Sequence, residues 1–259
     1  MDLGLKGRKA IVCASSKGLG RACAVALAQA GVEVVINGRD RAALEATAVD
    51  IAKASGVLVH AVAADVGTPE GRAALLAACP EPDILVNNNG GPPPKDFRKL
   101  SHDDLVAGVE KNMITPIALI QAVIDGMTAR KFGRIINITS GSVKAPLPNL
   151  DLSSGARAGL TAFVAGVARQ VASQNVTINC ILPGAFLTDR LKQIADQAAK
   201  EQGRTPAEVL AAREKTIPAG RLGNPDEFGQ LCAYLASSQA GYITGQNFLI
   251  DGGAFPGAF

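Results

Sequence analysis

The stretch Ile11-Val12-Cys13-Ala14-Ser15-Ser16-Lys17-Gly18-Leu19-Gly20 decides the fold. A short apolar run ends in a glycine-containing turn, and residues 21–30 then have the pattern of a helix. Glycines let a backbone approach a ligand closely, and a helix N-terminus supplies free N–H groups and positive potential. The stretch therefore predicts a strand, a phosphate-binding loop and a helix. The alternative is a turn that only packs the strand against the helix.

Strands and helices alternate along the rest of the chain. Runs of β-branched residues predict strands at 32–37, 57–62, 84–86, 134–139, 176–182 and 247–250. Helices are expected at 41–54, 68–79, 101–130, 152–173 and 225–237, with Asp40 and Thr68 as N-caps. The alternation predicts one α/β domain over residues 1–259. It is a doubly wound Rossmann-type parallel sheet of about seven strands with helices on both faces.

One segment is too long for a tight connection. Residues 189–220 form a polar, alanine-rich excursion after the sixth expected strand. Ligands of open α/β sheets bind beyond the carboxyl ends of the strands, so we expect this segment to be a substrate lid.

Composition excludes several classes of function. The net charge of +3 is not concentrated in one segment, which argues against a nucleic acid or a membrane surface as partner. No long apolar run could span a bilayer, and the N-terminus lacks an apolar signal core, so a cytoplasmic location is expected. Five scattered cysteines fit small buried hydrophobes, and two isolated histidines predict no metal site.

The end of the second expected strand bears on the cofactor. A carboxylate there would bind a ribose 2′-OH and favour NAD(H), but none is present. Lys17 and Arg39 could together bind a 2′-phosphate, which favours NADP(H) over NAD(H). The alternative is that Arg39 and Arg41 are only the solvated start of a helix, after the N-cap Asp40.

These motifs, together with others further along, resemble the classical short-chain dehydrogenase/reductase family, and within it the 3-oxoacyl-acyl-carrier-protein reductases. The loop at 13–20 resembles the family's Gly-x-x-x-Gly-x-Gly, with Ala14 at the first glycine position. Asn87-Asn88-Asn89-Gly90 resembles Asn-Asn-Ala-Gly. Matching residues continue in order over nearly the whole chain: Asp65-Val66, Asn112, Ser140, 179–184, Thr188, 217–221 and 244–253.

The resemblance implies a role for each matching position. Asp65 and Val66 would contact adenine, Asn112 would hold a water in a proton relay, and Ser140 would hydrogen-bond the substrate carbonyl. The implied cofactor-binding residues are Ala14, Ser16, Lys17, Gly18, Leu19, Gly20, Arg39, Asp65, Val66, Asn89, Gly90, Arg157, Pro183, Gly184 and Thr188.

The chain departs from the family at its Tyr-x-x-x-Lys signature. Thirteen residues after Ser140, where the tyrosine is expected, stands Ser153, and four residues later Arg157 replaces the lysine. The sequence after Arg157 continues the family's Lys-Ala-Gly-Leu in register, so no insertion is needed. The two tyrosines of the chain, Tyr234 and Tyr242, lie near no catalytic segment.

This departure matters because carbonyl reduction needs an acid for the developing alkoxide. A serine hydroxyl is a much weaker acid than a tyrosine, and an arginine holds its proton too tightly. Arg157 could still bind the nicotinamide ribose and keeps the positive charge. We therefore expect cofactor binding to persist and the usual proton transfer to be lost.

Three interpretations follow. The first is an NADP-dependent oxidoreductase acting on a ketone or secondary alcohol, with another proton donor. Lys144 is one such donor, unless it is an ordinary surface lysine, and Asp151 is another, unless it is a helix N-cap. The second is a reaction in which Ser140 and Arg157 only stabilise an oxyanion. The third is an NADP-binding sensor or oligomer partner without activity.

The expected catalytic set is Ser140, Asn112, Ser153, Arg157 and Lys144. The resemblance also implies a homotetramer or homodimer that packs the helices starting near Ser101 and Leu152. Small residues in 158–171 would permit close helix contact.

Overall fold

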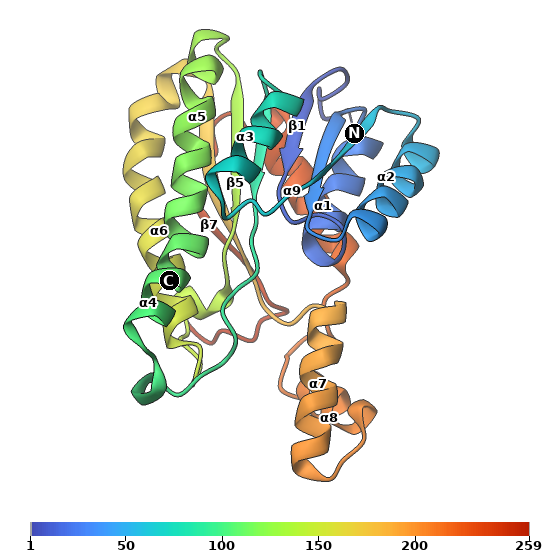
Figure 1. Cartoon of the computed structure of the whole chain (residues 1–259), viewed down its shortest axis with the longest axis vertical. Coiled ribbons are helices and arrows are strands. Elements are labelled where there is room, and N and C mark those ends of the chain that lie inside the picture. Colours follow the sequence, from blue (N-terminus) through green and yellow to red (C-terminus); the bar gives the residue numbers. More distant parts are fainter. Residues whose placement is uncertain (1, 259) are drawn as a thin grey trace.

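A seven-stranded parallel sheet forms the centre of the structure, a computed structural model that describes residues 2–258 (Figure 1). Its strand order is β3-β2-β1-β4-β5-β6-β7, and each neighbouring pair runs parallel. The strands are β1 (Lys9–Val12), β2 (Glu33–Gly38), β3 (Val59–Ala63), β4 (Ile84–Asn87), β5 (Gly133–Ile138), β6 (Val176–Pro183) and β7 (Asn247–Ile250). The strand order reverses between β1 and β4, which is where such sheets bind ligands. The predicted fold class is confirmed.

Helices cover both faces of the sheet. The helices are α1 (Gly18–Gln29), α2 (Arg41–Ser55), α3 (Pro69–Ala78), α4 (His102–Val109), α5 (Thr115–Ala129), α6 (Asp151–Val171), α7 (Asp189–Gln202), α8 (Pro206–Glu214) and α9 (Pro225–Ala236). One apolar core joins the sheet to α1, α2 and α9, and a second joins it to α3, α5 and α6. The central strands are buried on both sides, which explains their continuous apolar runs.

The cysteines contribute to these two cores as small apolar side chains. All five are free and buried. Burial raises the pKa of Cys13 and of Cys180 to about 12, so both thiols stay protonated at neutral pH. The expectation that the cysteines are buried hydrophobes is confirmed.

Most predicted helix boundaries agree with the structure, and the caps explain why. Asp40 accepts a hydrogen bond from the backbone of α2, and Thr68 does the same for α3. The interpretation of Asp151 as an N-cap is wrong. Leu150 is the N-cap of α6, Asp151 is its first residue, and no side-chain bond caps the helix. The carboxylate still lies in the first turn, where the helix dipole favours it.

Two other segments are more structured than expected. The helix predicted at 101–130 is divided into α4 and α5 by a π-helical turn, Glu110–Ile114. The excursion at 189–220 contains α7 and α8, which project from the body as an arm (Figure 1). A small apolar cluster of Leu191, Ile217 and Leu222 lies at the base of this arm. Within residues 2–258, no helix combines the length and the apolar character that a membrane crossing needs.

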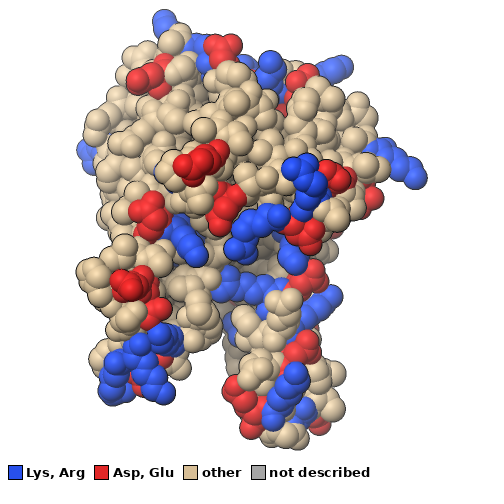
Figure 2. Space-filling view, in the orientation of Figure 1, with Lys and Arg blue, Asp and Glu red and all other residues tan. Residues whose placement is uncertain are grey.

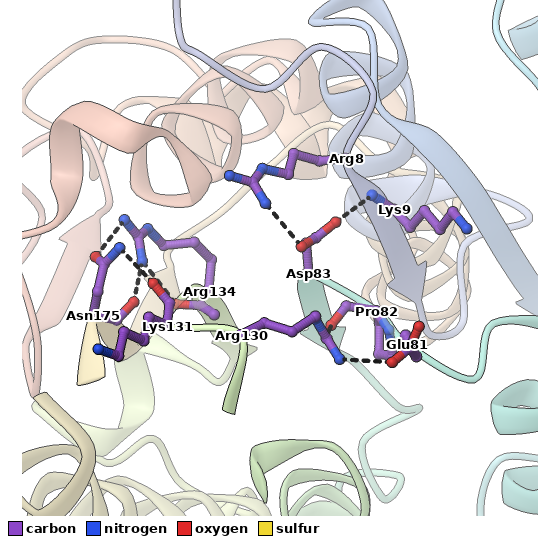
Figure 3. A network of polar contacts seen from close by, with 10 residues as sticks. Arg8, Lys9, Glu81, Pro82, Asp83, Arg130, Lys131, Arg134 and Asn175 are labelled. Carbon is purple, nitrogen blue, oxygen red and sulfur yellow. Dashed lines mark hydrogen bonds and ion pairs between the residues drawn. The ribbon is translucent and has the colours of Figure 1, made fainter. Parts of the chain in front are cut away.

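The strand starts form what we call the amino edge of the sheet, and a polar network ties it together (Figure 3). Arg134 on β5 is 1% exposed and donates to the carbonyl oxygens of Ser237, Gly133 and Asn175 at 2.8–3.0 Å. Its guanidinium stacks on the ring of Phe132, 4.4 Å from the centroid. These contacts join β5 to the end of α9 and to the loop before β6.

Candidate functional site

The strand ends form the opposite, carboxyl edge, where the phosphate loop is held by hydrogen bonds from neighbouring strands. Ser15 N donates to Asn37 O at 2.7 Å, and Ala14 N donates to Asn37 Oδ1 at 3.3 Å. Asn88 Nδ2 donates to Ala14 O at 3.1 Å. A side chain on Gly20 would collide with that same carbonyl, so α1 requires glycine there. The loop is thus a rigid platform at the N-terminus of α1, as a phosphate site needs.

Ala14 adopts an unusual backbone conformation. Its φ of +45° lies in the left-handed region that favours glycine. This is the position at which the resemblance expected a glycine. The chain therefore keeps the loop geometry of the motif although the residue differs.

Charged side chains suited to a 2′-phosphate surround the end of β2. Lys17 and Arg39 are both exposed, and neither forms an ion pair among residues 2–258. Ser16 lies beside them, since its Oγ is 3.0 Å from the position of a Cβ on Gly38. The nearby carboxylate of Asp40 is engaged in capping α2. Lys17 and Arg39 are therefore available for an anionic ligand, and their binding of a phosphate on the adenosine ribose stays a prediction.

Residues after β3 and β4 continue the same edge. Asp65 Oδ1 accepts from Gly67 N at 2.8 Å, and the neighbouring Val66 is buried. Asn89 Oδ1 accepts from Gly90 N at 2.8 Å, which shapes the turn after β4. The structure thus brings these expected cofactor-binding positions to the carboxyl edge, and their contacts with the cofactor stay a prediction.

The segment after β6 faces the phosphate loop from the other side. Gly184 N donates to Ile250 O at 2.9 Å, and this bond fixes the chain just beyond Pro183. Thr188 caps α7 by accepting from its backbone at 3.3 Å. A Cβ on Gly18 would lie 3.8 Å from Thr188 Cγ2. The phosphate loop and the segment after β6 therefore lie within contact distance of each other.

Ser153 and Arg157 lie one turn apart on α6 and are hydrogen-bonded to each other. Arg157 Nε donates to Ser153 Oγ at 3.3 Å, and Arg157 Nη1 donates to Ile138 O, at the end of β5, at 2.8 Å. Nη2 makes one longer bond of 3.5 Å to Asn89 O. The arginine is only 8% exposed. Ser153 thus has the geometry of an acceptor that positions Arg157.

The charge of Arg157 is not neutralised by any carboxylate within the described chain, because no ion pair includes it. Burial, together with a smaller effect of the nearby Arg190, lowers the pKa of Arg157 to about 10. The guanidinium still carries its charge at neutral pH. A buried cation without a carboxylate is costly unless a ligand or protein dipoles compensate it.

Arg190, in the first turn of α7, is a residue that the sequence reasoning missed. A Cβ on Gly91 would lie 3.4 Å from both terminal nitrogens of Arg190 and 3.5 Å from Nη2 of Arg157. Two guanidinium groups from distant segments therefore meet at one point. The available signal was the place of Arg190 just after Thr188, where a segment leaving the carboxyl edge must cross the site. Figure 2 shows Lys and Arg side chains gathered around the hollow between the body and the arm.

Ser140 and Asn112 complete the expected catalytic positions. Ser140 Oγ accepts from Ser142 N at 3.1 Å, which leaves its hydroxyl proton free to be donated. Asn112 is buried in the π turn between α4 and α5, and its Nδ2 donates to Gly108 O at 3.3 Å. Its Oδ1 has no hydrogen-bond partner among residues 2–258. Buried acceptors of this kind are usually satisfied by an ordered water.

Lys144 has a different environment from the other four residues of the expected catalytic set. Its ammonium lies 5.7 Å from the centre of the Phe255 ring in the C-terminal segment. Among the described residues, no hydrogen bond or ion pair joins Lys144 to Ser140, Ser153 or Arg157. Its role as a proton donor stays a prediction. The described part of the chain holds no cluster of three metal-ligating side chains.

A parallel sheet whose strand order reverses next to a glycine-containing loop is the architecture of Rossmann-type nucleotide-binding proteins. A family model described as "Enoyl-(Acyl carrier protein) reductase" matches residues 13–254. The chain belongs to the short-chain dehydrogenase/reductase family of NAD(P)-dependent oxidoreductases.

Relatives extend over the full length of the chain. It is 34% identical over 259 residues to the 3-oxoacyl-[acyl-carrier-protein] reductase FabG of Vibrio cholerae, covering 98% of this chain and 99% of that protein. It is 32% identical over 252 residues to the NADPH-dependent reductase BacG of Bacillus subtilis, covering 95% and 97%.

A solved structure also matches the fold closely. The L-sorbose reductase of Gluconobacter frateurii, in complex with NADPH and L-sorbose, has a TM-score of 0.92 and 30% identity, over 97% of this chain and 98% of that one. The names of two of these three proteins specify NADPH, in agreement with the predicted preference for NADP(H).

Proposed function

We propose that the protein is an NADP(H)-dependent oxidoreductase that interconverts a ketone and a secondary alcohol with an atypical active site. The observation that carries the proposal is the anchoring of Arg157 by Ser153 Oγ and Ile138 O at the carboxyl edge. This arrangement keeps a fixed positive charge where the family's lysine is expected. The resemblance to 3-oxoacyl reductases supports a small-molecule carbonyl compound as substrate.

The residues around the loop fit the cofactor. Backbone N–H groups at the start of α1 would bind the pyrophosphate, and Lys17 and Arg39 would bind the 2′-phosphate. Arg157 has two N–H groups without a protein partner, since three of the five donors of its guanidinium are used. One of these would bind the ribose next to the nicotinamide, which leaves the other for the substrate. NADP(H), when bound, supplies or accepts the hydride.

The chain's own residues would stabilise the oxygen that becomes an alkoxide. Ser140 donates its hydroxyl proton to that oxygen as a hydrogen bond, and Arg157 adds a positive charge. Ser153 acts through Arg157, because its Oγ already accepts from Nε. Proton delivery falls to a water held by Asn112 Oδ1 or to Lys144, instead of to a tyrosine.

The test is binding and turnover by the intact protein. NADPH and NADH binding are measured by fluorescence, and NADPH consumption is followed with a panel of ketones. We expect NADPH to bind at least tenfold more tightly than NADH, and Arg39→Met to remove most of that preference. A protein that binds neither cofactor contradicts the proposal. Binding without turnover on any carbonyl compound would favour the sensor or partner interpretation.

Lys144 requires its own variant. If Lys144→Ala keeps the parent rate, the ammonium is not the proton donor, and the water at Asn112 becomes the source. Lys95→Ala is the matched control, because this lysine is half-buried like Lys144 and is paired with Asp104.

Assembly as a homodimer or homotetramer is part of the same proposal. Phe163 on α6 is 39% exposed, and Gly155 and Gly166 on the same helix leave open space around them. Such a surface suits helix-to-helix packing between copies. Phe163→Asp should reduce the mass in solution, measured by light scattering, and an unchanged mass would exclude this face.

A further inference from the structure

The two guanidinium groups that meet at Gly91 are not explained by cofactor binding alone. Arg157 is held from α6, and Arg190 comes from α7, at the base of the arm. Neither forms an ion pair within residues 2–258. Two like charges at one partly desolvated place repel each other, and a shared anion removes that repulsion.

The position of the pair indicates which anion it would take. The phosphates of the cofactor already have the loop at 15–20 and the exposed Lys17 and Arg39. Arg157, in contrast, donates hydrogen bonds to Ser153 Oγ and to Ile138 O. Ile138 is the last residue of β5 and precedes Ser140 by two residues. An anion at Gly91 therefore lies on the side of the site where the substrate carbonyl would be.

From this placement we infer that the substrate is an oxo acid whose carboxylate binds between Arg157 and Arg190. The inference rests on the proposed function, because it assigns the substrate class of the same site. A carboxylate accepts two parallel N–H bonds from a guanidinium, and its two oxygens can be shared between two such groups. Binding of the acid would also fix the base of the arm over the substrate, since Arg190 belongs to α7.

The experiment uses the intact protein saturated with NADP⁺ and titrated by calorimetry with matched pairs of compounds. The probes are acetoacetate, 4-oxopentanoate and phenylpyruvate, each against its methyl ester. We expect at least one acid to bind roughly 30-fold more tightly than its ester, because a charge-assisted bond of this kind is strong. If every acid binds like its ester, or if no acid binds, the inference is wrong.

Variants of the exposed Arg190 separate this site from the cofactor site. Arg190→Met should remove the preference for the acid, and Arg190→Lys should restore part of it. Lys200→Met, an exposed lysine at the far end of α7, is the control and should keep the parent preference.

The affinity for NADPH distinguishes the two sources of negative charge. It should change less than twofold in Arg190→Met. If this variant instead weakens NADPH binding and leaves the ratio of acid to ester unchanged, the pair binds a cofactor phosphate and the inference is overturned. Failure of the proposed function is separate, because it appears as a parent protein that does not bind NADPH or oxidise it with any carbonyl compound.

Discussion

Arg134 at the amino edge and Arg157 at the carboxyl edge are both buried, and burial lowers the pKa of each to about 10. In both places a second arginine accounts for a smaller part of this lowering of the pKa, Arg8 at the amino edge and Arg190 at the carboxyl edge. The two differ in how their donors are used. Arg134 makes four hydrogen bonds to protein oxygens, two of them to Asn175 (Figure 3), whereas Arg157 makes three, one of them at 3.5 Å.

The difference separates a structural charge from a functional one. Arg134 is surrounded by carbonyl oxygens and an aromatic ring, so the protein itself compensates its charge. Arg157 keeps donors for a ligand in a sheet edge where the fold binds nucleotides. The same side chain is therefore saturated at one edge and left incomplete at the other.

The largest expected effect is on stability at the amino edge. Arg134→Met should lower the free energy of unfolding by about 3 kcal/mol, because it removes the hydrogen bonds of a buried charged group to the carbonyl oxygens of Ser237, Gly133 and Asn175. Chemical denaturation measures this, with the exposed Arg98→Met as the control. A loss no greater than in the control would mean that the hydrogen bonds of Arg134 contribute nothing to stability.

At the carboxyl edge, Arg157→Met should reduce activity strongly and change stability little. Removing a charge that stabilises the transition state typically costs roughly 100-fold in kcat/KM. Stability should change by less than about 1 kcal/mol, since the lost bond to Ile138 O is offset by the removal of a costly buried charge. Steady-state kinetics and denaturation on the same preparation decide. Equal losses of stability in the two variants would end the distinction between the edges.

Sequence reasoning identified the fold because the strands are uninterrupted apolar runs and the helices carry their caps. It also placed Ser153 and Arg157 four residues apart in the helix expected at 152–173, and residues four apart in a helix are neighbours. Their hydrogen bond follows from this spacing. Arg190 was missed because its partner at Gly91 is far away in sequence. The hydrogen bonds of Arg134 to backbone carbonyl oxygens could not be predicted either, because every residue type has such an oxygen.

The charge of Arg157 also determines how stability and activity depend on pH. The folded pKa of Arg157 lies below its unfolded value, so the cost of burying the charge is present at every pH below about 10 and is relieved above it. Arg157 therefore adds no pH dependence to stability between pH 5 and about 9, and activity that needs its charge should fall only as pH rises through about 10.

Arg157→Lys should move that alkaline limb to lower pH, because lysine starts from a pKa of about 10.4 and burial lowers it. The pH profile of kcat/KM measures this shift. An alkaline limb that stays in place in the lysine variant would mean that another group controls it.

The smallest expected effect concerns Ala14 at the carboxyl edge. Ala14→Gly should raise the free energy of unfolding by at most about 1 kcal/mol, because the left-handed φ of +45° costs alanine more than glycine. Thermal unfolding measures the change, and Ala10→Gly, in a regular strand, should be destabilising instead. A lower melting temperature for Ala14→Gly would show that the left-handed conformation of Ala14 is not strained.

The central claim is that this site transfers hydride without a tyrosine. The direct measurement is a single turnover, in which protein with bound NADPH is mixed with a carbonyl substrate and the loss of NADPH absorbance is followed. The parent protein should oxidise its bound NADPH. If the parent leaves NADPH unchanged while the double variant Ser153→Tyr with Arg157→Lys oxidises it, the scaffold binds the cofactor but the natural chain is not a reductase.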